Sequence, residues 1–135
     1  MTSAQARQRF GAARVARLAT ADREGRPHIV PVVFAVDGDR IYSAVDAKPK
    51  RTTALRRLAN VAENPVVALL VDHYDDADWG ALWWVRAEGR GRVLGSGDDE
   101  ATRAVALLQR RYPQQRAIGS VLAVDVDRWS GWAAR

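Results

Sequence analysis

The sequence feature that most constrains the fold is a long alternating stretch at residues 82–94. Charged residues and a tryptophan recur there at every second position, with apolar or small residues between them. The first set is Trp84, Arg86, Glu88, Arg90 and Arg92, and the second is Trp83, Val85, Ala87, Gly89, Gly91 and Val93. Successive side chains of an extended chain point to opposite faces, so this period of two predicts a long β-strand.

Five further segments favour β-strands, because runs of β-branched and apolar residues are bounded there by turn residues. They lie at residues 15–21, 28–36, 40–45, 66–71 and 121–126. The segment 28–36 is apolar on both faces, which predicts a strand buried in a barrel wall, with Pro31 at a local edge or bulge. Most of these strands lie too close together for crossover helices. We therefore expect a mainly β protein with short helices, built as a split or closed barrel of about six antiparallel strands.

Three short helices are expected around these strands, at the N-terminus, at residues 50–63 and from about residue 96 to residue 112. Apolar residues at helical spacing mark the face that each helix should bury. These faces are Ala6, Phe10 and Ala13 in the first helix, Leu55, Leu58, Ala59 and Ala62 in the second, and Ala101, Val105 and Leu108 in the third. A chain of 135 residues is long enough for one hydrophobic core, so residues 1–135 are expected to form a single domain.

The composition excludes several classes of function. The chain has no cysteine, which rules out disulfides, thiolate metal sites and a cysteine nucleophile. No apolar run approaches the roughly 20 residues that span a bilayer, and the N-terminus lacks the apolar core of a secretory signal, so we expect a cytoplasmic protein without membrane contact. A net charge of +5 suggests nucleic acid, but the arginines are dispersed and no recognised binding motif is present, so no nucleic-acid partner is expected.

The two lysines of the chain, Lys48 and Lys50, stand together with Arg51 just before the second expected helix. The N-terminus of a helix carries partial positive charge and free N–H groups, so cations there are unfavourable unless an anion joins them. Thr52 adds a hydroxyl that can donate or cap. The pattern predicts an anion site, with a phosphate as the natural ligand, and a solvated basic loop is the alternative.

The acidic segment at residues 72–78 contains His73 and invites a metal interpretation. Its spacing does not match a calcium loop, and no second histidine is clustered with it. We expect an acidic surface loop and no metal site, with a pocket-lining His73 as the second interpretation.

Five tryptophans are many for a chain of this length. Packing is the expected role of Trp83. Trp84 shares a strand face with Arg86 and Glu88, whereas Trp79 and Trp129 are expected at strand ends near loops. These three tryptophans are the candidates to line a ring pocket. Arg86, Glu88 and Arg90 are expected to form cross-strand ion pairs, which gives Glu88 a structural role.

The order of these features resembles the pyridoxamine 5′-phosphate oxidase-like split-barrel superfamily of flavin and deazaflavin proteins, over nearly the whole chain. Four short elements in the family's order carry the resemblance. They are Leu18-Ala19-Thr20-Ala21 with Gly25-Arg26-Pro27 and Pro31-Val32-Val33-Phe34, then Lys48-Pro49-Lys50-Arg51-Thr52, then Asn64-Pro65-Val66-Val67, and finally Arg86-Ala87-Glu88-Gly89. Val71-Asp72-His73-Tyr74 and Leu82-Trp83-Trp84-Val85-Arg86 look most like an actinobacterial branch of coenzyme F420-dependent enzymes.

The resemblance implies a homodimer of split barrels, with two cofactor sites at the interface that are each built from both subunits. It implies that Lys48, Lys50, Arg51 and Thr52 hold the phosphate of the cofactor. By the same analogy Val32 contributes to the site, and Tyr42 and Ser43 approach the ribityl chain. The catalytic residues are not identifiable, because hydride transfer is chemistry that the cofactor itself carries.

Three functions follow from the resemblance. The first is a coenzyme F420-dependent oxidoreductase that acts on a small organic substrate, which the sequence does not identify. The second is an FMN-dependent oxidoreductase of the same fold, and the third is a non-catalytic protein that binds flavin, F420 or haem. Pyridoxal phosphate synthesis is not expected, because the C-terminal Arg-x-His pattern of the true oxidases is missing.

Overall fold

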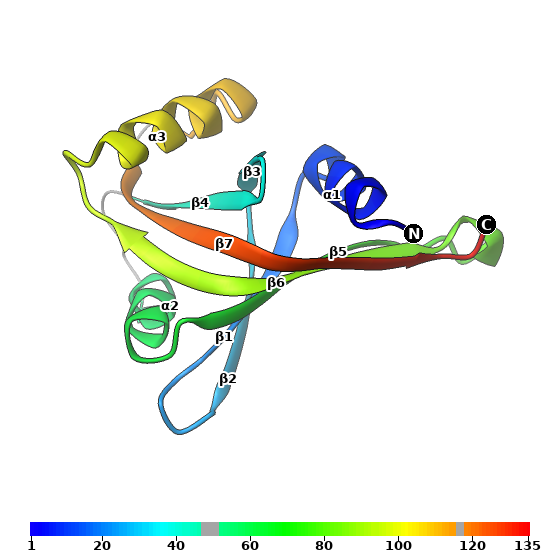
Figure 1. Ribbon diagram of the computed structural model, residues 1–135, viewed down its shortest axis with the longest axis horizontal. Helices are drawn as coiled ribbons and strands as arrows, with labels where there is room; N and C mark the ends of the chain where they lie inside the picture. Colours follow the sequence, from blue (N-terminus) through cyan, green and yellow to red (C-terminus); the bar gives the residue numbers. More distant parts are fainter. Residues whose placement is uncertain (47–51, 116–117) are drawn as a thin grey trace.

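The computed structural model describes residues 1–46, 52–115 and 118–135. Within these residues seven strands form one antiparallel sheet in the order β2-β1-β5-β6-β7-β4-β3 (Figure 1). The elements are α1 (Ser3–Ala12), β1 (Ala16–Ala21), β2 (Pro27–Val32), β3 (Phe34–Asp37), β4 (Arg40–Asp46), α2 (Thr52–Glu63), β5 (Val66–His73), the short 3-10 helix η1 (Trp79–Ala81), β6 (Trp83–Leu94), α3 (Asp99–Arg111) and β7 (Ile118–Ala133). This confirms the predicted mainly β split-barrel fold with short helices.

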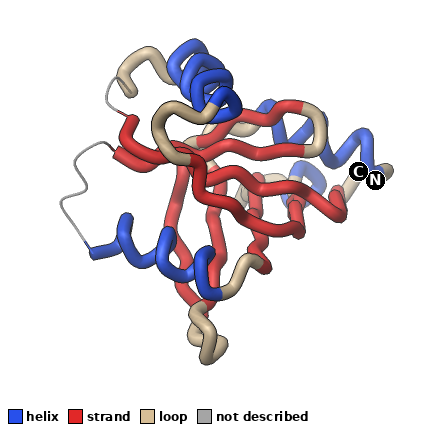
Figure 2. The backbone as a smooth tube through the Cα atoms, turned by 60° about the vertical axis from the view of Figure 1, so that its left-hand side comes forward, coloured by secondary structure: helices blue, strands red, loops and turns tan. Residues whose placement is uncertain are grey.

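The barrel closes because two strands that are consecutive in the chain form the two edges of the sheet. β2 pairs only with β1 and β3 only with β4, yet a single residue, Val33, separates β2 from β3. One residue spans only ~3.5 Å, so the two edges must come together. The view in Figure 2 shows the curled sheet with helices at its ends and on its side.

The predicted strand at residues 28–36 is therefore two strands, which accounts for seven strands instead of about six. The expectation that this whole run is buried in a barrel wall is wrong for β2, where Ile29 is 66% exposed. Pro31 lies within β2, an edge strand, as expected for a residue that cannot donate to a ladder.

The inner face of the sheet holds one hydrophobic core, which α1 and α2 close at two ends. Phe10 of α1 packs against Phe34 and Trp129, with ring centroids 4.9 and 5.4 Å away. From α2, Val61 enters this core where β6 carries Gly91. A Cβ atom on Gly91 would lie 2.9 Å from Val61 Cγ1, so the glycine permits the close approach of α2.

The orientation of α2 differs from the prediction. Its buried side carries Asn60 and Val61, while Leu55, Ala59 and Ala62 of the predicted inward face are exposed. The helix is held in this rotation by a buried hydrogen bond, in which Asn60 Nδ2 donates to Thr20 Oγ1 at 3.0 Å. A polar residue thus fixes the buried face that the apolar spacing alone misplaces.

A second hydrophobic core lies on the outer face of the sheet, beneath α3. The helix buries Ala101, Ala104 and Leu108 there, and Val105 is half-buried. Tyr112 fastens the end of α3 to the barrel, because its hydroxyl contacts the carbonyl oxygens of Phe34 and Arg14 at 3.0 and 2.9 Å. The predicted inward face of this helix is confirmed.

β7 extends well beyond the predicted strand at residues 121–126 and changes register near its middle. The register shift falls between the pairs Glu88–Arg128 and Gly89–Val126, which places Asp127 in a β-bulge. Beyond this bulge Trp129 points inward, and Ser130 and Trp132 lie on the outer side. In the part of the chain that the structure describes, no helix is long and apolar enough to cross a membrane.

Candidate cofactor site

Lys48, Lys50 and Arg51, the centre of the predicted phosphate site, lie outside the described residues. The structure describes the elements on either side of them. β4 ends at Asp46, and α2 begins at Thr52, for which only the backbone is described. The first turn of α2 contains no acidic residue, so no carboxylate of the helix itself offsets its positive end. The phosphate site stays a prediction.

Ser43 lies on β4 just before this segment and faces the interior of the barrel. It pairs with Phe34 on one side and Leu122 on the other, both in the inner core. Its side chain is only 3% exposed, and its hydroxyl has no hydrogen-bond partner among the described residues. A buried hydroxyl without a partner is costly, and a polar atom of a bound cofactor would satisfy it.

Tyr42 faces the opposite side of the same strand. Its hydroxyl lies beneath α3 and donates a 2.8 Å hydrogen bond to Glu100 Oε2. Burial and this bond to a carboxylate raise the pKa of Tyr42. Neighbouring residues on one strand point to opposite faces, so Tyr42 and Ser43 do not approach one ligand from the same side.

Glu100 belongs to a network of charges between α3 and the sheet. Arg92 on β6 binds Glu100 through two hydrogen bonds of 2.8 and 3.0 Å, and it binds Asp125 on β7 at 2.7 and 2.9 Å. These bonds to Arg92 lower the pKa of Glu100 to about 2 and also lower the pKa of Asp125. The same two carboxylates raise the pKa of Arg92.

Two more of the predicted cofactor residues lie in the inner core. Val32 is 5% exposed, and Trp129 is 8% exposed in the interior of β7. The expectation that Trp129 stands at a strand end is therefore wrong. Its indole Nε1 donates to Asp39 Oδ1 at 2.9 Å, which lowers the pKa of Asp39.

On the outer face, Trp84 forms part of a shallow cavity of about 400 Å³. Trp84 pairs directly with Trp132 across β6 and β7, and the guanidinium of Arg86 lies 5.3 Å from the Trp84 ring centroid. We call this cavity the tryptophan groove. It is lined by Leu70, Asp72, His73, Tyr74, Leu82, Trp83, Trp84, Arg86 and Trp132.

The acidic segment beside the groove is a surface loop, as predicted. Asp75 and Asp78 accept hydrogen bonds from backbone N–H groups of the loop, and Asp78 also forms an ion pair with Arg135 at 2.6 Å. Among the described residues no group of His, Asp and Glu is placed to hold a metal ion. His73 stacks on Trp83 with ring centroids 6.3 Å apart. His73 also lines the groove, as expected from the interpretation of it as a pocket-lining residue.

Trp79 and Glu88 complete the predicted set. Trp79 lies in η1 and is 67% exposed, outside the lining of the groove. Glu88 Oε1 accepts from Arg86 Nε at 3.0 Å, so Glu88 forms an ion pair as expected, and its structural role stays a prediction. The expected cross-strand geometry is wrong for this pair, because both residues lie on β6. Among the described residues, β6 forms a cross-strand ion pair through Arg92 and Asp125 of β7.

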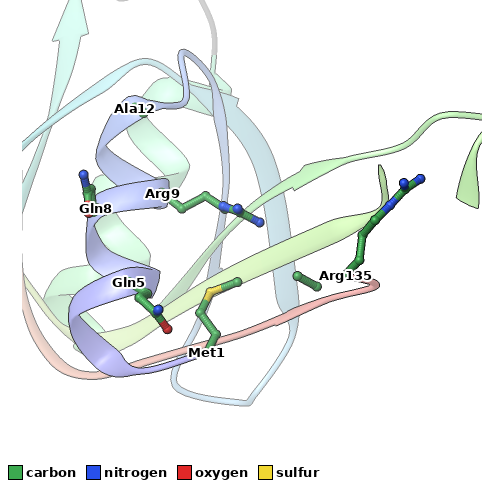
Figure 3. A pocket seen from close by; sticks show the side chains of 7 residues that line it. Met1, Gln5, Gln8, Arg9, Ala12 and Arg135 are labelled. Atoms are coloured by element: carbon green, nitrogen blue, oxygen red, sulfur yellow. The ribbon is translucent and has the colours of Figure 1, made fainter. Parts of the chain in front are cut away.

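A larger cavity, of about 640 Å³, lies between α1 and the end of β7 (Figure 3). None of the predicted cofactor residues lines it. Its two arginines are already engaged, since Arg9 lies 5.0 Å from the centroid of the Trp83 ring and Arg135 binds Asp78 and the carbonyl of Gly80. Of the two cavities, the tryptophan groove is therefore the better candidate for a ligand-binding site.

Within one chain, the end of the barrel closed by α2 and the tryptophan groove are separate. Gly91, which contacts α2, and Trp84 are seven positions apart on β6, or ~23 Å at the rise of a strand, and they point to opposite faces. The predicted cofactor residues therefore do not gather at one place in a single chain, and Tyr42 under α3 and Trp79 in η1 lie at neither of these two places. Leu70 and Trp132 line the groove but were not predicted to do so, although the alternation in β6 placed Trp84 on one face with Arg86 and Glu88.

A seven-stranded split barrel, with a helix N-terminus after a basic segment, is the architecture of one class of cofactor-binding domain. Residues 2–133 match the family model described as pyridoxamine 5′-phosphate oxidase. This match covers nearly the whole chain, so the protein belongs to that family.

Individual relatives agree with this assignment. The chain is 33% identical over 84 residues to a 5a,11a-dehydrotetracycline/5a,11a-dehydrooxytetracycline reductase of Streptomyces rimosus; the aligned part is 62% of this chain and 58% of the reductase. The chain therefore spans less than two thirds of the length of that enzyme.

Two solved structures share the fold. Conserved hypothetical protein Rv2991 of Mycobacterium tuberculosis superimposes with a TM-score of 0.76 at 20% identity, over 100% of this chain and 86% of that one. An FAD-binding protein (mll6688) from Mesorhizobium loti superimposes with a TM-score of 0.72 at 21% identity, over 97% and 92% of the two chains.

Proposed function

We propose that this protein is an oxidoreductase that uses coenzyme F420 to transfer a hydride to or from a small organic substrate. Membership of the pyridoxamine 5′-phosphate oxidase family carries the proposal. The reductase from Streptomyces supports the reaction class, and the FAD-binding neighbour supports a flavin-type cofactor. FMN is the alternative cofactor on the same fold.

The sequence before α2 and the start of this helix support a phosphate site for such a cofactor. The positive end of α2 has no acidic residue of its own, and the predicted ligands Lys48, Lys50, Arg51 and Thr52 stand in the sequence at this point. The unpartnered hydroxyl of Ser43 lies on the strand that leads to them. When bound, the cofactor supplies the hydride chemistry, and the protein supplies binding, orientation and shelter from water.

A homodimer is part of the proposal, because one chain leaves a sheet face uncovered. Ile29 on β2 and Val66 on β5 are 66% and 58% exposed, and Leu55 on α2 is 54% exposed. Exposed apolar side chains that together form a patch often mark interaction surfaces. A second copy that covers β2, β1 and β5 would also bring residues of both chains near one cofactor.

The test is a calorimetric titration of the purified protein with F420 and, separately, with FMN. We expect F420 to bind with a dissociation constant of about 1 μM or lower, and Lys50→Ala and Arg51→Ala each to weaken binding about tenfold or more, since each removes a charge-assisted bond to phosphate. Arg103→Ala, an exposed arginine on α3, is the matched control and should bind normally.

The outcomes separate the candidate functions. Tight FMN binding with no F420 binding would replace the cofactor in the proposal. Binding of haem alone, or binding of F420 with no turnover of any electron acceptor, would favour the non-catalytic alternative. If neither F420 nor FMN binds, the phosphate site is wrong. Sedimentation of the same samples measures whether the protein is a dimer.

A further inference from the structure

The helix α2 turns a polar residue toward the barrel and several apolar side chains away from it. α2 lies against β6 and β1, as Figure 1 shows. Among its described side chains, Asn60 and Val61 are buried, whereas Leu55 is 54% exposed and Ala62 is also exposed. At 3.6 residues per turn, Asn60 and Leu55 point ~140° apart around the helix axis. Within one chain, burial of apolar surface would therefore favour a different rotation, with Leu55 turned inward.

A buried hydrogen bond holds the observed rotation of α2. Asn60 Nδ2 donates to Thr20 Oγ1 at 3.0 Å, and both residues are only 3% exposed. Thr20 lies on β1, in a row of inward-facing residues with Ala16 and Leu18. A buried amide without a partner is costly, so this rotation is stable only while the Thr20 hydroxyl lies opposite Asn60. The bond therefore selects one rotation of the helix where apolar burial does not.

The neighbour of Asn60 in the chain, Val61, occupies a space that a glycine on β6 leaves free. A Cβ atom on Gly91 would lie 2.9 and 3.3 Å from the two γ-carbons of Val61. The N–H of Gly91 also donates to the carbonyl oxygen of Pro65 at 2.7 Å, just beyond the end of α2. The C-terminal half of α2 is therefore fixed to the barrel. Because a helix is stiff, this half determines the orientation of its start at Thr52, ~12 Å from Asn60.

The orientation of α2 matters because the proposed phosphate site is at its N-terminal end. The N–H groups and side chains of a first helical turn rotate with the helix, and their bonds to a phosphate need the right direction as well as the right distance. We propose that Asn60 is a positioning residue for cofactor binding: its bond to Thr20 sets the rotation at which α2 presents its N-terminus to the phosphate. This inference rests on the proposed function, and neither Asn60 nor Thr20 contacts the cofactor in it.

The test compares three variants of the full chain in calorimetric titrations with F420 and, separately, with FMN. Thr20→Val keeps the shape of the side chain but leaves the Asn60 amide buried without a partner, and we expect it to weaken binding of the cofactor about tenfold. Thr20→Ser keeps the hydroxyl and should bind within about twofold of the native chain. The double variant Thr20→Val with Asn60→Leu replaces both partners by apolar groups of similar shape, so it should recover most of the affinity.

The rotation of α2 is measured separately with a single thiol. The chain has no cysteine, so Val61→Cys places one thiol on the buried side of the helix. Its reaction with dithionitrobenzoate should be slow in the native background and about tenfold or more faster when Thr20→Val is added, because the buried side then opens to solvent. The control is Leu108→Ala, which empties a buried position beneath α3. It should lower the stability of the protein but change neither the thiol rate nor the affinity for the cofactor.

Parallel changes in affinity and thiol rate would support the inference. It is overturned if Leu108→Ala weakens binding as much as Thr20→Val, since the loss would then follow stability and not rotation. A double variant that regains stability without regaining affinity overturns it too. If the native chain binds a cofactor and Thr20→Val changes neither the affinity nor the thiol rate, the positioning role alone is wrong. If the native chain binds neither F420 nor FMN, the proposed function is wrong, and the role of Asn60 in it is lost as well.

Discussion

The outer face of the sheet has two halves, which share β6 and β7, and a helix covers only one of them. Over β3, β4, the start of β7 and the end of β6, α3 covers a hydrophobic core that includes Ala35, Ala44 and Val121. Over β2, β1, β5, the start of β6 and the end of β7, the outer side chains are open, with Ile29 and Trp132 largely exposed. We refer to these as the covered half and the open half.

The two halves treat the charged residues of β6 differently. On the covered half, Arg92 is held by Glu100 from α3 and Asp125 from β7, and the Glu100 side chain is only 15% exposed. On the open half, Arg86 has its ion pair with Glu88 on the same strand, and both side chains are more than 40% exposed. One periodic strand therefore supplies a structural ion network at one end and an accessible arginine at the other.

The test of this division with the largest expected effect compares the substitution of two leucines. Leu108→Ala empties a fully buried position beneath α3 and should cost about 2 to 4 kcal/mol of unfolding free energy. Leu70→Ala, at a partly exposed position of the open half, should cost about 1 kcal/mol or less. Urea denaturation at low protein concentration measures both. Equal losses would mean that the open half is packed as tightly as the covered half.

The pH dependence of stability tests the covered half alone. The pKa of Glu100 is lowered to about 2 when the protein is folded, against an ordinary value of 4.5. A carboxyl with a depressed folded pKa stabilises the protein above its unfolded pKa, and this contribution is lost as the pH falls from about 5 towards 2. Because Arg92 is partly solvated, we expect the contribution to be only about 1 to 2 kcal/mol.

Glu100→Gln should therefore be less stable than the native chain at pH 7 and should show a shallower loss between pH 5 and pH 2, measured by urea denaturation across that range. The control is Glu88→Gln on the open half, where the pair is exposed and the slope should not change. An unchanged slope in Glu100→Gln would show that the network under α3 does not stabilise the fold.

Much of the fold was predictable because local patterns decide it. The alternation in β6 and the helical spacing of Ala101, Val105 and Leu108 in α3 each indicated the observed element. The division of residues 28–36 into β2 and β3 was not predictable from pattern. No turn residue marks Val33, and the break follows from closure of the barrel, which is a property of the whole sheet.

The candidate site was less predictable for a related reason. Alternation along a strand predicts that Tyr42 and Ser43 lie on opposite faces of β4. In the same way it predicts that Trp84 lies on one face of β6 with Arg86. Whether a face lies under a helix depends on where α3 packs, and Tyr42 is bound to Glu100 for that reason. The rotation of α2 was missed because Asn60, a polar residue, occupies its buried side and bonds to Thr20.

The smallest expected effect on the fold, and the sharpest test of what covers the open half, comes from Ile29→Lys. The side chain is exposed on an edge strand, so the substitution should change the unfolding free energy of one chain by about 0.5 kcal/mol or less. If a second copy covers β2 and β1, the buried lysine would oppose association, and sedimentation should show a shift from dimer to monomer. Ala106→Lys, on the exposed side of α3, should leave the mass unchanged. A dimer that survives Ile29→Lys would place the contact between copies elsewhere, and the open half would then be available as a whole to ligands.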